Sequence, residues 1–421
     1  MLFRIVQIVT ASTWETFKFL FKSSWHPEKI ATSNVQQNIA HIFVRICEKL
    51  GGAFPKFGQI LSTRADILPL EVLNILCVLQ DKVSQLPKTT ITREIEAWRH
   101  HHAIDNLLIE WDSLPLAAGT IAQVHKAILW NGTEVALKIR RPSVHNVLAK
   151  DTQILIVIGR LFTNLSLFHN IPIKEVLDQI CHALVLQSDF QQEANNHKYL
   201  SKAFSDSLNV DIPKLFEELC TETVLCLEFI PDAVRISDRS LDRPTARKAL
   251  LNGLHALYRM IFIEGLIHCD LHPGNLLAKH DGSIVILDTG FVTKISDEIR
   301  INFANFFLSI IMKDGLETAR ILRETAFYIS HEFEKTNFDK AVCDLVNQWG
   351  GVSAEEFNVI RFVESLFLVQ RNFGVCSSPH FTLIIIALLV YEGVVKQISP
   401  DLEFQSEALP FVMAAIAGMP S

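Results

Sequence analysis

Two carboxylates and one amide stand at a spacing that could hold a metal ion. Asn275 follows Asp270 by five positions in IHCDLHPGN (267–275), and Asp288 follows an apolar run in ILDTG (286–290). Carboxylate and amide oxygens are ligands that Mg²⁺ takes in proteins, and a further carboxylate can orient an attacking hydroxyl. The pattern predicts a catalytic loop in which Asn275 and Asp288 hold magnesium against nucleotide phosphates while Asp270 faces the phosphoryl acceptor.

A lysine earlier in the chain adds a positive charge to this set. Lys138 ends the segment VALK (135–138), which in protein kinases lies on a strand and places its lysine against the α- and β-phosphates. The tetrapeptide alone is weak, because exposed strand lysines are common. The motif becomes significant because it precedes the Asp270 loop and the Asp288 segment in the chain, as in protein kinases. Glu193, on a predicted helix, is the candidate partner of the lysine, although an isolated helical glutamate more often faces solvent.

The segment AAGT (117–120) stands where a kinase carries its glycine-rich phosphate cover. We predict nucleotide contacts for Ala117, Ala118, Gly119 and Thr120, and for Val124 on the strand that follows. Small side chains let backbone amides approach phosphate, but alanine restricts the positive φ angles that glycine permits. Without its context, the segment would be an ordinary turn.

Polar side chains also share one face of an earlier predicted helix. Lys56, Gln59 and Thr63 fall at i, i+3 and i+7. They could point together at a ligand or at another part of the protein, and the alternative is a half-solvated helix. The histidines beside Asp270, His268 and His272, are expected to brace the backbone, because magnesium takes oxygen ligands.

The predicted elements follow a two-lobed α+β plan. An Asn-Gly pair at 131–132, between two strand-like runs, indicates a hairpin whose second strand carries Lys138. A helix that ends near Gly265 and a short strand at 284–287 place the Asp270 loop between helix and strand. We expect helix over most of 1–110, 143–205 (continuous at 176–200), 243–263 and 296–418, and strands at 111–116, 121–129, 134–139, 210–214, 223–229 and 284–287.

Composition limits the classes of function. Of 421 residues 49% are hydrophobic, which predicts a sizeable core, and a net charge of −7 argues against nucleic acid as a partner. A mean hydropathy of +0.24 is high for a freely soluble enzyme and indicates a membrane neighbour or an apolar substrate. Eight scattered cysteines predict neither structural zinc nor a disulfide framework.

Two apolar stretches could concern a membrane. No run reaches the roughly 18 apolar residues of a membrane span, so 381–391 is expected to be a buried core helix. Residues 1–24 are apolar but interrupted by charges, and they lack a cleavage site of the secretory type. An amphipathic helix that lies on a membrane, or on the protein's own body, fits them.

Together and in this order, the motifs resemble those of the UbiB family of atypical protein-kinase-like proteins, which is associated with ubiquinone and other polyprenyl-lipid pathways. The likeness spans about residues 38–400. The KFGQ segment and the HPGN loop ending are far more specific than a generic kinase pattern. The motifs as they stand here are KFGQILSTRADILP (56–69), AAGTIAQVHKA (117–127), VALKIRRP (135–142), QSDFQQEA (187–194), LEFIPD (227–232), HCDLHPGN (268–275) and LDTGF (287–291).

The resemblance implies a two-lobed protein-kinase-like fold with a helical N-terminal extension packed over the active site. It implies ATP and Mg²⁺ as cofactors, Lys138 paired with Glu193 on the α/β-phosphates, and Asp270 orienting the attacking hydroxyl or water. Lys56 and Gln59 would occlude the site from protein substrates, which favours ATP hydrolysis or action on a small lipid. The implied parts are an N-terminal amphipathic segment (1–37), a helical extension (38–110), an N-lobe (111–232) and a helical C-lobe (233–421).

Three positions depart from the family pattern. Gln187 replaces the first acidic residue of a Glu-x-Asp motif that keeps Asp189, so the acidic partner expected for Lys56 is a neutral amide. Thr289 replaces the aromatic residue of Asp-Phe-Gly, and Gly119 stands where alanine is usual. These changes bear on regulation more than on nucleotide binding.

The leading hypothesis is a magnesium-dependent ATPase or atypical kinase that supports polyprenyl-quinone synthesis. Its expected partners are ATP, an isoprenoid or quinone-type lipid or membrane surface, quinone-biosynthesis proteins and a second copy of the chain. The alternative is a nucleotide-gated lipid-binding scaffold with little turnover. A phosphotransferase of the aminoglycoside-kinase type shares the Asp-to-Asn spacing but leaves KFGQILSTR unexplained. The expected location is peripheral, on the cytoplasmic face of the inner membrane, with the matrix side of the mitochondrial inner membrane as the alternative.

Overall fold

A computed structural model describes most of the chain, in two compact units. The described residues are 6–8, 10–15, 18, 35–62, 64, 68, 70–80, 85–102, 107–162, 173–349, 359–404 and 406–418. The first unit takes in 1–86, 118–123 and 140–188, and the second takes in 87–117, 124–139 and 189–421. Of the predicted N-terminal helix, residues 6–8, 10–15 and 18 are described and helical.

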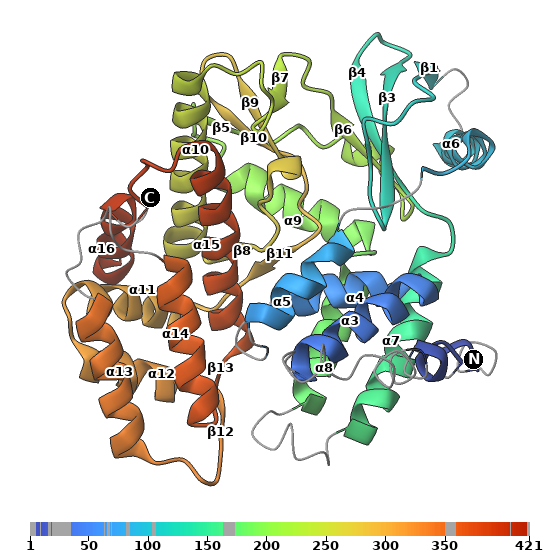
Figure 1. Ribbon diagram of the computed structural model, residues 1–421. Helices are drawn as coiled ribbons and strands as arrows, with labels where there is room; N and C mark the ends of the chain where they lie inside the picture. The colour runs from blue at the N-terminus through green and yellow to red at the C-terminus, as the bar shows by residue number, and fades with distance from the viewer. Residues whose placement is uncertain are drawn as a thin grey trace. The chain divides into compact units, whose positions relative to one another are not determined.

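The first unit is a group of helices around an apolar core (Figure 1). Its helices are α3 Val35–Leu50, α4 Ala53–Ser62, α5 Leu70–Leu76, α7 Val144–Phe162 and α8 Ile173–Leu186, with the 3-10 helix Cys77–Gln80. The chain turns between α3 and α4 at Gly51 and Gly52, whose φ angles of 56° and 62° suit glycine. Asp151 on α7 accepts a hydrogen bond from Ala53 N (3.1 Å), which caps the start of α4.

The second unit opens with helix α6 Lys88–His102 and contains most of a five-stranded sheet. The strands have the order β1-β3-β4-β6 with β2 beside β3, and they are β1 Leu108–Trp111, β2 Ala117–Ala118, β3 Ala122–Leu129, β4 Glu134–Arg140 and β6 Val224–Glu228. Gly132, at a φ of 81°, closes the predicted hairpin between β3 and β4. Val135, Leu137 and Ile139 on β4 are fully buried. Lys138 therefore faces the opposite side of its strand, because successive side chains alternate.

Helix α9, Phe190–Ala203, carries Glu193. Asp189 has extended backbone angles and caps the helix, since its Oδ1 accepts hydrogen bonds from Gln191 N (2.9 Å) and Gln192 N (3.2 Å). The continuous helix predicted for 176–200 is therefore wrong. α8 ends at Leu186, and the cap at Asp189 starts a new helix whose first turn contains Glu193.

A helix and short strands position the predicted catalytic loop. α10 Arg243–Tyr258 continues as a π-helix, Arg259–Glu264, which ends at Gly265 with φ 63°. The following elements are β8 Leu266–His268, the 3-10 helix Pro273–Asn275, β9 Leu276–Lys279, β10 Ile284–Ile286 and β11 Val292–Lys294. β8 pairs with β11, and a second sheet has the order β5-β10-β9-β7, with β5 Val210–Asp211 and β7 Ala233–Arg235. Leu276 pairs with Ile286, so the residues just before β9 and just after β10 are neighbours.

The rest of the second unit is mainly helical. Its helices are α11 Asp297–Ile311, α12 Gly315–Glu324, α13 Lys335–Trp349, α14 Val359–Asn372, α15 Pro379–Ile398 and α16 Leu409–Ala417. α10 and α15 lie side by side (Figure 1), and Tyr391 Oη donates to Leu250 O (2.7 Å). Among the described helices, α15 is long and apolar enough to cross a membrane, but 61% of its apolar stretch is buried, as in the core helix expected there.

Three further predictions of elements are wrong. The first strand of the sheet is Leu108–Trp111 instead of 111–116, and β5 is shorter than the strand predicted at 210–214. Residues 296–418 are not all helical, because β12 Ala326–Ile329 pairs with β13 Val375–Ser377 in antiparallel fashion. That pairing joins segments far apart in the sequence, and no local periodicity reveals it.

Candidate active site

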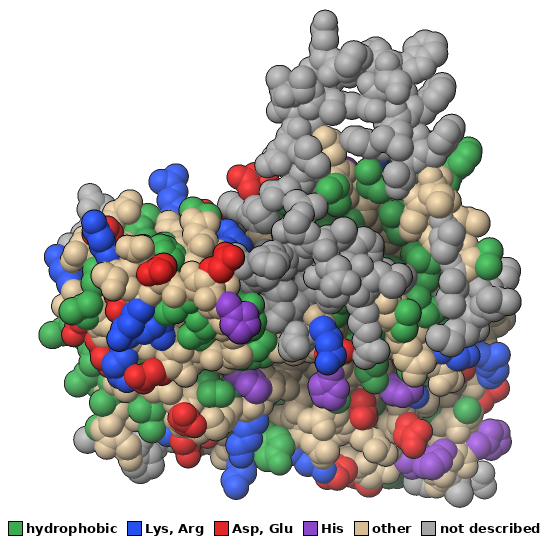
Figure 2. All heavy atoms as spheres, turned by 90° about the horizontal axis from the view of Figure 1, so that it is seen from below, with side chains coloured by type: hydrophobic (Ala, Val, Ile, Leu, Met, Phe, Trp, Pro, Cys, Tyr) green, Lys and Arg blue, Asp and Glu red, His purple; other side chains and the backbone are tan. Residues whose placement is uncertain are grey.

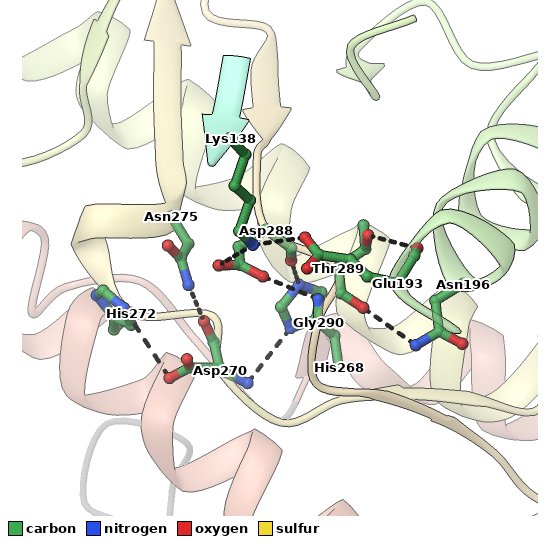
Figure 3. Close-up of polar contacts among 10 residues, drawn as sticks. All are labelled: Lys138, Glu193, Asn196, His268, Asp270, His272, Asn275, Asp288, Thr289 and Gly290. Atoms are coloured by element: carbon green, nitrogen blue, oxygen red, sulfur yellow. Dashed lines mark hydrogen bonds and ion pairs between the residues drawn. The ribbon is translucent and has the colours of Figure 1, made fainter. Parts of the chain in front are cut away.

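Lys138 lies between two carboxylates in the second unit (Figure 3). Its Nζ is 2.5 Å from Glu193 Oε1 and 3.1 Å from Asp288 Oδ2. β4 supplies the lysine, the capped first turn of α9 supplies Glu193, and the segment after β10 supplies Asp288. The exposed fractions of the lysine and glutamate side chains are only 12% and 3%. The structure thus assembles the ion pair that the sequence predicted for Lys138 and Glu193, and it adds Asp288 as a second partner.

Burial and charge together shift the pKa values of these three groups. Burial disfavours the Lys138 ammonium, but Asp288 and Glu193 outweigh it and raise the pKa of Lys138 above its usual range. Burial raises the pKa of Glu193 to about 7, against the lowering effect of Lys138. Burial by itself would raise the pKa of Asp288, but Lys138 and the Gly290 N–H hold that pKa well below its usual range. One ammonium faces two carboxylates, so the cluster favours a further cation.

His268 joins the catalytic loop to the Asp288 segment. Its ring is fully buried, with Nε2 at 2.6 Å from Asp288 O, and Nδ1 accepts from Asp270 N (3.3 Å). Because Nδ1 accepts, the proton of the neutral ring sits on Nε2 and is donated to the Asp288 carbonyl. Burial lowers the pKa of His268, which agrees with a neutral ring. Its role is to brace two backbone segments that carry the predicted functional carboxylates.

Asn275 is oriented by the same loop. Its Nδ2 donates to Asp270 O (2.9 Å), and its own carbonyl oxygen accepts from Leu287 N (3.0 Å). The side-chain oxygen of Asn275 is therefore the end of the amide left for a ligand. His272 shapes the turn between Asp270 and Asn275, since its Nδ1 accepts from Gly274 N (3.0 Å). A Cβ at Gly274 would lie 2.6 Å from the His272 ring, so this approach requires glycine.

The donor set fits magnesium. Glu193 Oε2 is buried and has no hydrogen-bond partner among the described residues. Gly290 keeps space there, because a Cβ at this position would lie 3.1 Å from Asp288 Oδ1 and 3.3 Å from Glu193 Oε2. Among the described residues, no group of three or more His, Cys, Asp or Glu side chains could enclose a metal ion. Asn275 and Asp288 offer side-chain oxygen atoms. Mg²⁺ is commonly held by one or two such protein oxygens together with substrate phosphates.

The other predicted nucleotide-contact residues lie on and beside the hairpin strands. Ala117 and Ala118 form β2, and Leu116 N donates to Val124 O on β3 (2.8 Å). Gly119 N donates to Ala122 O (2.8 Å), and Gly119 O accepts from Arg141 Nε (2.8 Å). Gly119 has no positive φ, and a Cβ there would make only an ordinary 3.6 Å contact. Thr120 follows as a half-buried residue.

The residues predicted to occlude the site belong mainly to the first unit. Lys56 and Gln59 lie on α4, where Gln59 Nε2 donates to Leu79 O (2.8 Å). Gln187 is buried, and its Oε1 has no hydrogen-bond partner among the described residues. Asp189 has the structural role of capping α9. Thr63 lies outside the described residues, and occlusion by Lys56 and Gln59 stays a prediction.

Sequence reasoning missed Asn196, which lies one helical turn after Glu193 on α9. Its Nδ2 donates to Thr289 O and to Val292 O, each at 3.1 Å. The available signal was an asparagine inside a helix, where the side chain commonly faces solvent or bonds to nearby backbone. The sequence did not show which backbone it would meet.

A strand lysine held by a helical glutamate, beside an Asp-to-Asn loop and an Asp-x-Gly segment, defines an atypical kinase-like catalytic unit. Residues 78–322 match the sequence pattern of the ABC1 atypical kinase-like domain, and residues 342–403 match that of the UbiB helical domain. Because the first match covers more than half of the chain, the protein belongs to the ABC1 atypical kinase-like family. The predicted UbiB-type resemblance and the α+β kinase-like fold are thereby confirmed.

Individual proteins align with most of this chain. An uncharacterized protein from the hydrogenase 1 5′ region of Clostridium pasteurianum is 27% identical over 97% of this chain and 76% of its own. A probable protein kinase UbiB from Shewanella piezotolerans is 29% identical over 87% of this chain and 68% of its own. A solved structure of Rv3197 with erythromycin, from Mycobacterium tuberculosis, aligns over 93% of this chain and 98% of its own, with 18% identity and a TM-score of 0.47.

Proposed function

We propose that this protein binds Mg-ATP and transfers or hydrolyses its terminal phosphoryl group in support of polyprenyl-quinone (ubiquinone) biosynthesis at a membrane. The observation that carries the proposal is the contact of Lys138 with both Glu193 and Asp288. His268 joins the Asp288 segment to the loop that presents Asp270 and Asn275. A lysine fixed in this way can neutralise nucleotide phosphates without becoming a flexible surface charge.

Each side chain has a distinct role in the proposal. Lys138 binds the α- and β-phosphates, and Glu193 keeps its ammonium in place. Asn275 and Asp288 hold magnesium, which when bound neutralises charge on the phosphates. Asp270, whose side chain is 43% exposed, orients the attacking hydroxyl or water. His268 keeps Asp270 and Asp288 at a fixed separation through their backbones.

Several features favour a lipid-coupled reaction. The family is associated with polyprenyl lipids, and the mean hydropathy of the chain is +0.24. Val6 and Trp14, on the described N-terminal helical residues, are 51% and 53% exposed. Exposed tryptophan and aliphatic side chains on a helix suit the boundary between water and lipid. We infer a peripheral position on the cytoplasmic face of the inner membrane, with quinone-biosynthesis proteins as partners.

The surface gives little support to a polyanionic partner. On the described part of the face in Figure 2, acidic and basic side chains are interspersed among apolar ones. The net charge of −7 also disfavours binding to a phosphate backbone. A membrane of zwitterionic lipid with some anionic lipid is a better match for these interspersed charged and apolar side chains.

The decisive experiment is magnesium-dependent ATP hydrolysis, with and without anionic liposomes, for wild type, Asp288→Asn and Asp270→Asn. We expect turnover that rises with liposomes and falls by about 10²–10⁴-fold in Asp270→Asn, the range for removing a positioned acid–base group. Asp288→Asn should lose turnover because it loses a charged metal ligand. Turnover equal to wild type in Asp288→Asn would refute the proposal.

Binding without turnover would favour the second candidate, a nucleotide-gated lipid-binding scaffold. The replacement of the usual acidic and aromatic residues by Gln187 and Thr289 is the observation in its favour. Wild-type protein that binds Mg-ATP and isoprenoid lipid but hydrolyses nothing on liposomes would identify the scaffold. Turnover that depends on Asp270 would exclude it.

A further inference from the structure

A group of buried hydrogen bonds joins α9 to the segment that follows Asp288 (Figure 3). Asn196 Nδ2 donates to Thr289 O and Val292 O, both at 3.1 Å, and Thr289 Oγ1 donates to Glu193 O at 3.2 Å. The bonds run in both directions, because a helix side chain reaches the segment backbone and a segment side chain reaches the helix backbone.

The Asn196 amide is engaged on both of its ends. Its Oδ1 accepts from Gln192 Nε2 (3.1 Å), while its Nδ2 meets two carbonyl oxygens. The partners fix the orientation of the amide, because a reversed amide would set its oxygen against two carbonyls. The exposed fractions of Asn196 and Thr289 are 6% and 1%. Leaving such buried groups unpaired is costly, so the bonds hold the two segments together.

These bonds lie beside the three charged groups. Glu193 is one turn before Asn196 on α9, and Thr289 directly follows Asp288. The helix that carries one carboxylate is thus fastened to the segment that carries the other, and Lys138 contacts both. In kinases with an Asp-Phe-Gly segment, packing of the phenylalanine distinguishes active from inactive arrangements. A threonine has no ring to pack, and here its hydroxyl and carbonyl form polar contacts with α9 instead.

We propose that Asn196 and Thr289 are positioning residues that form a polar latch between α9 and residues 289–292. The latch keeps Glu193 and Asp288 at Lys138 whether or not nucleotide is bound. It deepens the function proposed above, since its consequence for nucleotide binding rests on Lys138, Glu193 and Asp288 being the Mg-nucleotide site. Neither residue needs to touch substrate, because both act through the two carboxylates.

Hydrogen exchange on the nucleotide-free full chain tests the latch itself. Thr289→Val removes the hydroxyl at nearly constant shape, and loss of one such bond should speed exchange of amides in 190–203 and 289–294 by about 3- to 10-fold. Thr289→Ser keeps the hydroxyl and should exchange as wild type does. Thr325→Val, which removes a hydroxyl that donates to Ile321 O (2.7 Å) in α12, should leave both segments unchanged. Unchanged exchange in Thr289→Val, or equal acceleration in the Thr325 control, overturns the latch.

Binding of a non-hydrolysable ATP analogue tests the positioning role. The Mg²⁺ concentration for half-maximal binding should rise about 3- to 10-fold in Thr289→Val, in line with the loss of one hydrogen bond, and return to wild type in Thr289→Ser. A purely structural role would lower thermal stability and leave the Mg²⁺ requirement unchanged, which would refute positioning. Asn196→Leu, which loses two donated bonds, should show the larger effect, and if it fails to fold the Thr289 series decides.

The two measurements separate the latch from the proposed function. Wild type that binds no nucleotide refutes the proposed function, and the exchange data then decide alone whether α9 is fastened to 289–292. Segment-specific acceleration in Thr289→Val, rescued by serine, supports the latch in that case. Accelerated exchange with an unchanged Mg²⁺ requirement rejects the positioning role and leaves a structural contact.

Discussion

At the scale of single residues, chemistry at this site depends on how an ammonium is confined by carboxylates. Lys138 has little access to water and two charged partners, so its position is set by Glu193 and Asp288. A buried ion pair does not by itself add much stability, but removing one partner leaves uncompensated charge behind. The consequences of changing Lys138 therefore reach both folding and nucleotide binding.

Lys138→Met should destabilise the protein by about 3–5 kcal/mol, the range for breaking a buried pair by removing one partner. Two carboxylates would then face each other without a cation. Chemical denaturation would measure the loss, and a thermal-shift assay would show that Mg-ATP no longer raises the melting temperature. Lys126→Met is the control, because Lys126 pairs with Glu134 at the more exposed end of the hairpin. Equal small losses in both variants would contradict this account of Lys138.

Gly119→Ala should stabilise the protein by about 0.4–1 kcal/mol. Gly119 has an ordinary φ and room for a Cβ, so alanine restricts the unfolded chain without strain in the folded one. Alanine is the usual residue of the family pattern at this position, and the structure adds that alanine fits. Urea denaturation would test this, with Gly132→Ala as the contrast, because Gly132 has a φ of 81° and should lose stability. A loss of stability in Gly119→Ala would show that the loop needs glycine.

At the scale of elements, helix ends and close approaches decide whether the charged groups meet. The first turn of α9 carries Glu193, and Asp189 caps that turn. The α10 helix leads into the catalytic loop, and it packs on α15 with a hydrogen bond from Tyr391 Oη to Leu250 O. Both features lie outside the set of groups that contact the nucleotide in our proposal, but both belong to helices that carry those groups or lead into them.

Asp189→Ala should cost about 0.5–2 kcal/mol through loss of the α9 cap. Two amide donors at Gln191 and Gln192 would lose their acceptor, and the first turn would fray. Asp189→Asn keeps an oxygen acceptor and should recover most of the stability. Equilibrium unfolding of the two variants would measure the difference. An alanine variant as stable as the asparagine variant would rule out capping as the role of this residue.

Gly253→Ala should destabilise the protein by about 1–3 kcal/mol through overpacking. Its Cβ would lie 2.1 Å from Tyr391 Oη and 2.8 Å from Ile284 Cδ1, so α10 and α15 would have to separate. Gly393→Ala on α15 is the matched control, because no atom lies within 4 Å of a Cβ there. It should be neutral or stabilising, since alanine is the better helix former. Differential scanning calorimetry would decide, and equal effects of the two changes would contradict the packing argument.

At the scale of the whole molecule, buried neutral histidines link stability to pH. His125, His197 and His268 are nearly inaccessible to solvent, and burial lowers the pKa of each. A histidine with a lowered pKa in the folded state contributes stability that is present above its unfolded pKa and lost as pH falls. Glu193 changes stability with pH in the opposite direction, because burial raises its pKa to about 7. The stability that this group contributes increases as pH falls through that value.

A matched comparison isolates the contribution of His197. Its ring is 2.6 Å from Pro213 O, and glutamine can still donate to that carbonyl without titrating. Wild type should lose stability relative to His197→Gln as pH falls from about 7.5 to 5.5, because the unfolded histidine takes up a proton near pH 6.5 more readily than the folded one. Urea midpoints at several pH values would measure the difference. If the difference in urea midpoint between wild type and His197→Gln did not change with pH, His197 would not titrate in this range.

The sequence by itself determined the family and the order of the candidate site residues along the chain. Local motifs identified Lys138, Asp270, Asn275 and Asp288 as candidate site residues, because neighbouring residues supply the donor atoms. The hairpin at 131–132 was also predicted locally, because two adjacent residues decide the geometry of its turn. The resemblance to the UbiB family rested on the same motifs. Glu193 was also found, but only because a kinase lysine needs a helical partner.

Tertiary structure decided the contacts between segments distant in the chain. Asn196 and Thr289 are 93 positions apart, and nothing in either local sequence indicates that they bond. The same holds for the pairing of β12 with β13 and for the backbone bridge made by His268. Periodicity and propensity report on a residue and its near neighbours, whereas these bonds form only after packing has brought separate segments together.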